Sequence, residues 1–166
     1  MPAVTLKFIA ENDIPELQKI ALPTWEDTYL PILTKEQVDF MYQEIYSAEG
    51  LLKQMRAGQE FFFIQADEQT VGFLSVSLLN AEEGRYKLNK LYLLTQNQGS
   101  GYGRLALEAA ENYVKSLNGK LLELNVNRYN KARDFYERCG FTAVREIDIP
   151  IGRFWMNDFV FEKKLT

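Results

Sequence analysis

Apolar and polar residues alternate at two periods along this chain, and the periods predict where strands and helices lie. Residues 4–9 alternate with the period of a strand. Asn12 or Asp13 is expected to cap a helix that carries Pro15 in its first turn and runs toward Thr28. The chain therefore begins with a strand followed by a helix.

Two shorter helices are predicted next. Thr34 is followed three residues later by Gln37, a capping-box pattern for a helix that continues to about Tyr46. Ser47 then begins a further short helix that ends near Gly58. The first third of the chain is thus mainly helical.

The rest of the chain reads mainly as strands. Apolar, aromatic and β-branched runs bounded by turn residues predict strands at residues 61–66, 71–79, 88–94, 121–126, 142–149 and 154–163. Apolar positions at helical spacing predict a helix at residues 102–117, and another is expected to begin near Tyr129. This order indicates an α+β fold, with early antiparallel hairpins and later β-α-β units.

A glycine-rich loop joins the strand at residues 88–94 to the following helix. Free backbone N–H groups at a helix start bind anionic oxygen, and glycines let such a ligand approach closely. Glycines also occur in such turns for steric reasons alone, and the loop lacks the Lys-Ser/Thr of a P-loop. Glu123 lies near the spacing of a dinucleotide-binding acid, but inside a strand, so a dinucleotide fits poorly. The candidate anion-binding residues are Gln98, Gly99, Ser100, Gly101, Tyr102, Gly103 and Arg104.

A second motif follows the next strand. Residues 127–141 read N-x-x-N-x-A-x-x-F-Y-E-x-x-G-F, and the loop matches R/Q-x-x-G-x-G/A through Gln98, Gly101 and Gly103. Together, in this order and separation, the two motifs resemble the GNAT superfamily of acyl-CoA-dependent N-acyltransferases. The resemblance covers about residues 60–165 and extends more loosely to bacterial polyamine (spermidine/spermine) N-acetyltransferases.

The resemblance implies an α+β, GNAT-like fold: a mixed, mostly antiparallel, splayed central sheet of about six or seven strands flanked by helices. It implies acetyl-coenzyme A as co-substrate. The expected coenzyme contacts are the glycine loop together with Leu91, Tyr92, Leu93, Asn127, Asn130 and Tyr136. Asparagine after a strand is also a common turn or cap residue, so the two asparagines have a structural alternative.

Composition narrows the classes of function. A chain of 166 residues that is 46% hydrophobic suits a single domain, expected here to span residues 1–166. A formal charge of −4 disfavours a general nucleic-acid binder and is compatible with a cationic substrate. With one Cys and no His, the chain cannot form an internal disulfide or a His-dependent triad, and no metal site is expected.

Acyl transfer to an amine sets three chemical requirements. An ammonium with a pKa near ~10.4 must lose a proton, the carbonyl oxygen needs a donor, and the leaving thiolate needs a proton. The resemblance assigns the last role to Tyr136 and the donor to a backbone N–H near Tyr92 or Leu93. Relatives often carry a catalytic Glu where this chain has Asn89. Deprotonation is then expected to fall to water, ordered by Asn89 and a carboxylate elsewhere.

The acceptor site has fewer sequence signals. Trp25, Glu26, Asp27 and Tyr29 on the first helix are candidates, although a solvated helix face is the simpler explanation for the two acids. Cys139 is interpreted as a packing residue, because no His is present to activate it. Residues 154–156 (Phe-Trp-Met), expected to be exposed, suit a dimer contact, an acceptor wall or core.

The sequence therefore predicts an N-acetyltransferase that moves an acetyl group from acetyl-coenzyme A to a primary amine in a ternary complex, with polyamines as leading substrates. The alternatives are a protein or peptide amine acetyltransferase, a catalytically weak coenzyme A-binding module and, last, an interaction protein. No basic leader precedes an apolar block in residues 1–10, and no window approaches ~18 apolar residues, so a cytoplasmic protein without membrane contact is expected. A homodimer is also considered.

Overall fold

The computed structural model describes residues 3–165 and confirms the α+β class. The helices are α1 (Ile14–Tyr29), α2 (Lys35–Tyr46), α3 (Ala48–Arg56), α4 (Tyr102–Ser116) and α5 (Ala132–Arg138), with 3-10 turns η1 (Glu11–Asp13) and η2 (Thr95–Asn97). The strands are β1 (Thr5–Phe8), β2 (Glu60–Ala66), β3 (Gln69–Asn80), β4 (Arg85–Leu93), β5 (Leu121–Asn127), β6 (Thr142–Ile151) and β7 (Phe154–Lys164).

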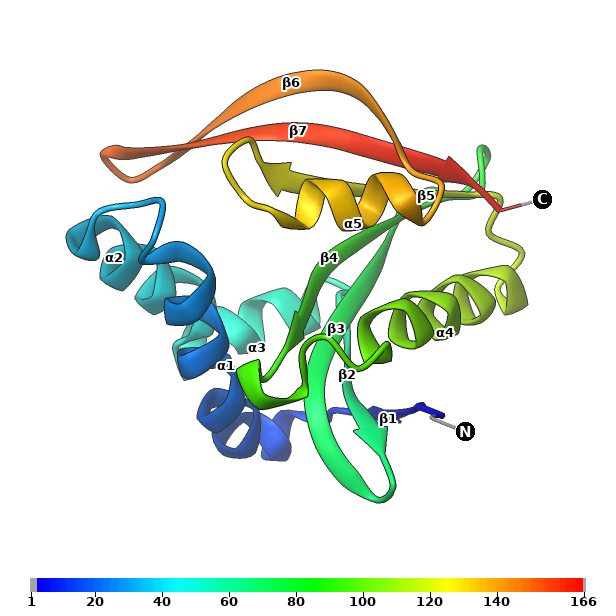
Figure 1. The fold of residues 1–166 in the computed structure, drawn as a ribbon, viewed down its shortest axis with the longest axis horizontal. Coiled ribbons are helices and arrows are strands. Elements are labelled where there is room, and N and C mark those ends of the chain that lie inside the picture. The colour runs from blue at the N-terminus through cyan, green and yellow to red at the C-terminus, as the bar shows by residue number, and fades with distance from the viewer. Residues whose placement is uncertain (1–2, 166) are drawn as a thin grey trace.

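The strands form one seven-stranded sheet in the order β1-β2-β3-β4-β5-β7-β6. Only β4 and β5 pair in parallel, and the other neighbours are antiparallel. Parallel neighbours need a long crossover, which α4 supplies. The mixed, mostly antiparallel sheet predicted from the sequence is therefore confirmed (Figure 1).

Each face of the sheet has its own apolar core. One core packs residues of α4 and α5 against β2–β5 and β7, while the other packs α1–α3 against β2–β4. Figure 1 shows α1–α3 grouped on one side of β4 and α4 on the other. The side chains of β4 thus serve two different layers, according to their alternation along the strand.

Two helix starts follow the predicted cap chemistry. The hydroxyls of Thr34 and Ser47 accept hydrogen bonds from the backbone N–H groups of Gln37 and Gly50. The capping box at Thr34 is only half formed, because the Gln37 amide donates instead to the carbonyl of Trp155 at 2.7 Å. This bond ties α2 to the distant strand β7.

Three expectations are wrong in detail. Asp13 lies at the cap position of α1 without a side-chain cap, because its carboxylate accepts from the N–H of Ala10 instead. The helix expected near Tyr129 begins at Ala132, whose N–H donates to the side chain of Asn130. Met156 is buried and not exposed, which agrees with the core alternative for this residue, whereas its neighbour Trp155 is 56% exposed. Within residues 3–165, no helix is long and apolar enough to span a membrane.

Candidate active site

The central strands β4 and β5 separate partway along their length. Their pairing runs only from Arg85 opposite Leu121 to Leu88 opposite Leu124. The register between β3 and β4 shifts at this point, since Val76 pairs with Leu88 and the preceding Ser75 pairs with Lys90. Asn89 is the extra residue of this bulge, and a bulge bends a strand and increases its twist. The sequence Leu88-Asn89 therefore marks where the sheet splays.

The bulge exposes backbone groups of β4 along the opening. The N–H of Leu94 donates to the carbonyl of Val71 on β3 at 2.9 Å. Antiparallel alternation then directs the N–H of Tyr92 to β3, and those of Leu91 and Leu93 away from it, toward the gap between β4 and β5. Of the two amides expected to face a thioester oxygen, only that of Leu93 faces the opening.

The glycine loop lies at the end of β4 that borders the opening. Gly99 and Gly101 have φ of 78° and 87°, and a Cβ on either would meet no atom within 4 Å. Gly101 is the N-cap of α4 and no side chain caps it, so the first N–H groups of α4 lack helical partners. A hydrogen bond anchors the loop to β4, because the Gln98 side chain donates to the carbonyl of Leu93 at 3.3 Å. This arrangement suits a pyrophosphate.

The remaining loop residues support this shape. Ser100 donates to the carbonyl of Asn97 at 2.6 Å, and Tyr102 is partly buried against the core below α4. Gly103 faces α5, and a Cβ there would make an ordinary van der Waals contact with the Phe135 ring at 3.5 Å. Arg104 is exposed and lies 3.5 Å from Glu108. Gly103 is thus a packing position, unlike the two open glycines.

Tyr136 points its ring into the core between α5 and the sheet. It is 8% exposed and contacts the rings of Phe135 and Phe141, with centroids 5.2 and 5.7 Å away. Burial raises the pKa of its phenol above the usual value. Its hydroxyl donates to no side chain or backbone group of residues 3–165. The hydroxyl oxygen is not fully enclosed by protein atoms. A protonated phenol therefore remains free to donate to a ligand.

The two motif asparagines hold the turn after β5. The side-chain oxygen of Asn127 accepts from the N–H of Tyr129 at 2.9 Å, and that of Asn130 accepts from the N–H of Ala132 at 2.9 Å. Both are Asx turns, which agrees with the structural alternative considered from the sequence. A contact between either amide and the coenzyme stays a prediction.

Four aromatic residues from three elements meet on the α1–α3 side of β4. The hydroxyls of Tyr29 and Tyr92 lie 3.3 Å apart, and the Trp25 ring contacts Tyr29 with centroids 4.3 Å apart. Phe73 lies beside Tyr92, at 5.5 Å between centroids. Burial raises the pKa of both tyrosines, so their hydroxyls stay protonated at neutral pH. Trp25, Tyr29, Phe73 and Tyr92 form an aromatic wall that carries two hydroxyl groups.

The first-helix candidates separate in the structure. Tyr29 belongs to the aromatic wall, and Trp25 is buried with its indole N–H bonded to the carbonyl of Val38 at 3.0 Å. Glu26 is half-buried toward α2, near Tyr42. Asp27 is exposed and accepts a hydrogen bond from Thr95 in η2, before the glycine loop. Only the two aromatic candidates are brought together with β4.

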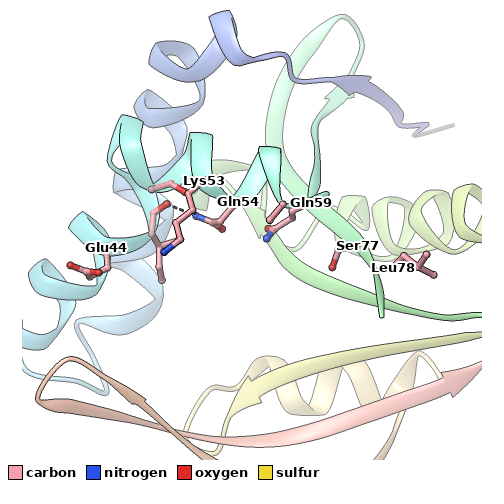
Figure 2. A pocket seen from close by; sticks show the side chains of 9 residues that line it. Glu44, Lys53, Gln54, Gln59, Ser77 and Leu78 are labelled. Carbon is pink, nitrogen blue, oxygen red and sulfur yellow. Dashed lines mark hydrogen bonds between the residues drawn. The ribbon is translucent and has the colours of Figure 1, made fainter. Parts of the chain in front are cut away.

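A pocket with mixed polar and apolar walls lies beside the bulge, between α2, α3 and the end of β3 (Figure 2). Its volume is about 470 Å³, and it is lined by Glu44, Ile45, Gly50, Lys53, Gln54, Ala57, Gln59, Ser77 and Leu78. Asn89 borders it by donating to the Ser77 hydroxyl at 2.9 Å. Lys90 donates to Gln54 and Gln59, and burial together with Lys87 lowers the pKa of its ammonium to about 7. Sequence reasoning did not single out Lys90.

The structure also brings Asp158 of β7 to the opening, another residue that sequence reasoning missed. It is 6% exposed, and its Oδ1 is fully enclosed with no hydrogen-bond partner in residues 3–165. Burial raises the pKa of its carboxyl group to about 6. A signal was present: Asp158 occupies an inward position of β7, between Met156 and Val160, where the alternation calls for an apolar side chain.

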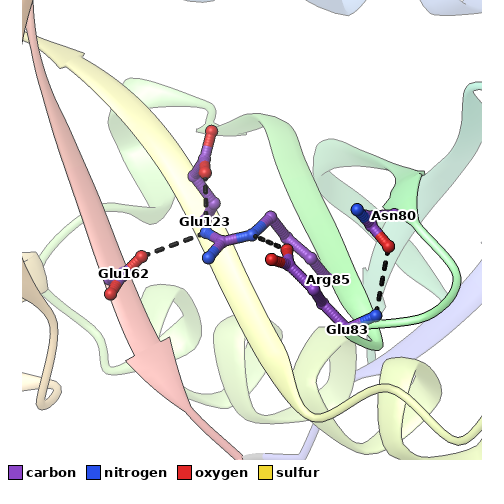
Figure 3. A network of polar contacts seen from close by, with 5 residues as sticks. All are labelled: Asn80, Glu83, Arg85, Glu123 and Glu162. Atoms are coloured by element: carbon purple, nitrogen blue, oxygen red, sulfur yellow. Dashed lines mark hydrogen bonds and ion pairs between the residues drawn. The ribbon is translucent and has the colours of Figure 1, made fainter.

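Glu123 has a structural role far from the glycine loop. Arg85 lies 2.9 Å from Glu123 on β5, 3.0 Å from Glu162 on β7 and 2.9 Å from Glu83 in the turn before β4 (Figure 3). The cluster joins β4, β5 and β7 at the end where β4 and β5 still pair. Glu123 is therefore a structural residue, which agrees with the poor fit to a dinucleotide expected from the sequence.

Cys139 is half-buried beside the core under α4 and α5. Burial raises the pKa of its thiol, which disfavours the reactive thiolate. Its structure therefore agrees with its interpretation as a packing residue.

Comparison with known families agrees with this geometry. A profile described as an acetyltransferase (GNAT) domain matches residues 29–149, most of the chain. The chain belongs to the GNAT acetyltransferase family. It is therefore an acyltransferase, and the resemblance read from its two motifs is confirmed.

Two curated relatives match over nearly the full length. An uncharacterized N-acetyltransferase of Lactobacillus delbrueckii subsp. lactis is 24% identical, over 100% of this chain and 100% of the relative. Spermidine N(1)-acetyltransferase of Thermoplasma acidophilum is 26% identical, over 98% of each chain.

One similar solved structure contains coenzyme A. The PaiA N-acetyltransferase of Thermoplasma acidophilum, in complex with coenzyme A, is 25% identical and superposes with a TM-score of 0.80, over 98% of this chain and 99% of that one. Acetyl-coenzyme A is thus the co-substrate of this GNAT enzyme. The open glycines and the unpartnered N–H groups of α4 fit its pyrophosphate.

Proposed function

We propose that this enzyme transfers the acetyl group of acetyl-coenzyme A to a primary amine by direct attack in a ternary complex, with polyamines as its preferred acceptors. The observation that carries the proposal is the opening between β4 and β5, which lies between an anion-binding helix start and a buried phenol. The 26% identical relative named for spermidine supports the choice of acceptor.

Each part of the opening has a proposed role. The N–H groups of Gly101 to Arg104 hold the pyrophosphate, which places the acetyl thioester, the source of the transferred group, along β4. The N–H of Leu93 donates to the carbonyl oxygen as charge develops there. Tyr136 gives its proton to the leaving sulfur, a role that its high pKa and unpaired hydroxyl permit.

The acceptor is proposed to enter on the α1–α3 side, against Trp25 and Tyr29. A polyamine carries several ammonium groups, and an acidic protein with a charge of −4 attracts them at long range. Asn89 borders the pocket beside the bulge, where its amide can help to order water. Direct attack then needs only the two substrates side by side in the opening.

A thiol-release assay with acetyl-coenzyme A and a panel of acceptors tests this function. Spermidine and spermine are expected to give a higher kcat/KM than butylamine, since their additional charges are attracted by the enzyme's carboxylates. This preference should weaken as added salt screens the charges. A preference that is independent of salt would contradict the electrostatic explanation.

The same assay separates the two alternatives. If a peptide with a free N-terminus exceeds every polyamine by about an order of magnitude in kcat/KM, which is ~1.4 kcal/mol, the enzyme is a peptide acetyltransferase. Protection against heat by coenzyme A without thiol release from any acceptor indicates a binding module.

We further propose that residues 1–166 act as one N-acetyltransferase domain in the cytoplasm. A homodimer stays a prediction, and the exposed Trp155 on the β6–β7 hairpin is the first residue to test for it.

A further inference from the structure

Asp158 is buried in a manner that folding alone does not explain. Its side chain is 6% exposed, and Oδ1 contacts neither solvent nor a hydrogen-bond donor of residues 3–165. Removing a carboxylate from water without a full set of donors costs free energy. Unsatisfied buried groups of this kind occur where a ligand completes the hydrogen bonding.

The position of Asp158 places this carboxylate at the acceptor side of the opening. On β7 it pairs with Asn127, the last residue of β5, beyond the point where β5 has left β4. Met156, two residues earlier on the same face of β7, packs in one core cluster with Trp25, Tyr29 and Phe73. The charge of Asp158 also contributes to the raised pKa of Tyr29 and, behind burial and the neighbouring tyrosines, to that of Tyr92. The carboxylate therefore lies close to the aromatic wall against which the acceptor is proposed to bind.

We propose that Asp158 receives the acceptor ammonium and takes the proton that the amine must lose before it attacks. The inference rests on the proposed function and supplies the carboxylate that this mechanism requires. It also explains how the chain works with Asn89 where relatives often place a catalytic Glu, because a carboxylate on β7 enters the opening from the opposite side.

The proton balance of the step is complete. A proton passes from the ammonium nitrogen to the Asp158 carboxylate, and the freed electron pair forms the C–N bond as the C–S bond breaks. Tyr136 protonates the sulfur, and the second proton of the nitrogen passes through solvent to restore the phenol. Asp158 then releases its proton to solvent. The products are the N-acetylated amine, coenzyme A and one proton.

The charges around Asp158 tune it for this task. Burial raises the pKa of its carboxyl group and Asp148 on β6 adds to this, whereas Lys87 on β4, the Asn125 side chain and Arg128 lower it. The result is about 6, near the optimum for a base that works at neutral pH. The other titratable groups at the opening, Tyr29, Tyr92 and Tyr136, have pKa values above their usual range and stay neutral.

The test compares Asp158→Asn with the parent enzyme, using spermidine as the acceptor. In the parent, kcat/KM should rise with pH around pH 6, as Asp158 loses its proton; this rise is the acidic limb of the pH profile. Asp158→Asn should lose this limb and roughly a hundred- to a thousand-fold in kcat, while the thermal shift with coenzyme A is retained. Its remaining rate should rise steadily toward pH 9, as the amine itself loses its proton. A parent-like pH profile in a folded Asp158→Asn enzyme would overturn the proposal.

Two further measurements exclude a merely structural role. With O-methylhydroxylamine, which is already uncharged at neutral pH, the loss caused by Asp158→Asn should largely disappear; an equal loss with both acceptors contradicts a proton-accepting role. Carboxyl-carbon NMR of the parent should show a carboxyl group that titrates near pH 6. This titration should be missing in Asp158→Asn, and in the parent it should move to lower pH when spermidine binds. No such movement contradicts contact with the ammonium.

Asp148→Asn is the matched control. This carboxylate is exposed, lies on the neighbouring strand and is 2.9 Å from Arg128. The variant should keep the limb, moved slightly to lower pH, and the parent's kcat. If the parent itself releases no thiol with any amine, the proposed function fails; if only the Asp158 predictions fail, the function stands with another proton acceptor.

Discussion

Burial moves the pKa of Tyr136 up and that of Lys90 down, because it disfavours the charged form of each side chain. Near physiological pH the Tyr136 phenol therefore stays neutral, and the Lys90 ammonium begins to lose its proton. For Tyr136 this preserves a proton that can be donated. For Lys90, deprotonation removes a buried positive charge. The side chains of Gln54 and Gln59 and the Phe61 ring stabilise that charge only in part.

Replacing Tyr136 with Phe removes the proposed acid and leaves the ring packing in place. We expect turnover to fall roughly ten- to a thousand-fold, within the range for loss of a general acid, while coenzyme A binding stays nearly unchanged. Steady-state kinetics and a thermal shift with coenzyme A measure the two effects. Full turnover in Tyr136→Phe would assign the proton to water.

Lys90 gives the fold a specific pH dependence. Its pKa is about 7 in the folded chain and 10.5 in the reference state, so between these values only the unfolded chain is fully protonated. The unfolded state then binds more protons, and the free energy of unfolding rises with pH across this window. The cost of burying the charge is fully present below pH 7.

We therefore expect the stability of the parent relative to Lys90→Met to increase between pH 7 and 10. Urea unfolding of both proteins at several pH values measures the difference in their free energies of unfolding. The contribution of the buried tyrosines is common to both proteins and cancels. A difference that stays constant with pH would show that Lys90 remains charged in the fold.

At the scale of elements, the loop before α4 combines two kinds of glycine. Gly101 faces open space with φ of 87°, whereas Gly103 faces Phe135. Gly101→Asp introduces a negative charge where the pyrophosphate is expected. Gly101→Asn introduces a side chain of the same size and the same backbone strain without the charge, and Asn tolerates this conformation.

We expect Gly101→Asp to abolish the rise in melting temperature with coenzyme A and Gly101→Asn to retain a reduced rise. Thermal unfolding with and without the coenzyme measures both. An unchanged shift in folded Gly101→Asp would move the pyrophosphate away from this loop.

Several elements follow from local sequence because their causes are local. Thr34 and Ser47 supply helix caps from their own side chains, and the apolar run at residues 121–126 indicates a strand without reference to a distant partner. The bulge at Asn89 does not follow, since it depends on how β4 pairs with β3. Gln37 likewise leaves its expected bond for a carbonyl on β7.

At the scale of the whole molecule, the motifs predicted the sheet class, which the structure confirms, and coenzyme contacts at the glycine loop, which stay a prediction. The proposed acceptor side was harder to predict, because its residues come from α1, β4 and β7, which are distant in sequence. Tyr29 was found as part of a helix, but Asp158 becomes meaningful only once β7 pairs with β5. Position along a strand does not reveal what lies across the opening.

The seam between β4 and β5 also sets the order in which the chain can be assembled. All four strands on one side of it lie within Thr5–Leu93, and all three on the other within Leu121–Lys164. A chain emerging from the ribosome can therefore form its first four strands, three of which are joined by hairpins, before the others exist. The parallel pairing of Arg85–Leu88 with Leu121–Leu124 must wait until α4 has been synthesised. A nascent chain that ends within α4 already contains the glycine loop, but not yet the second wall of the opening.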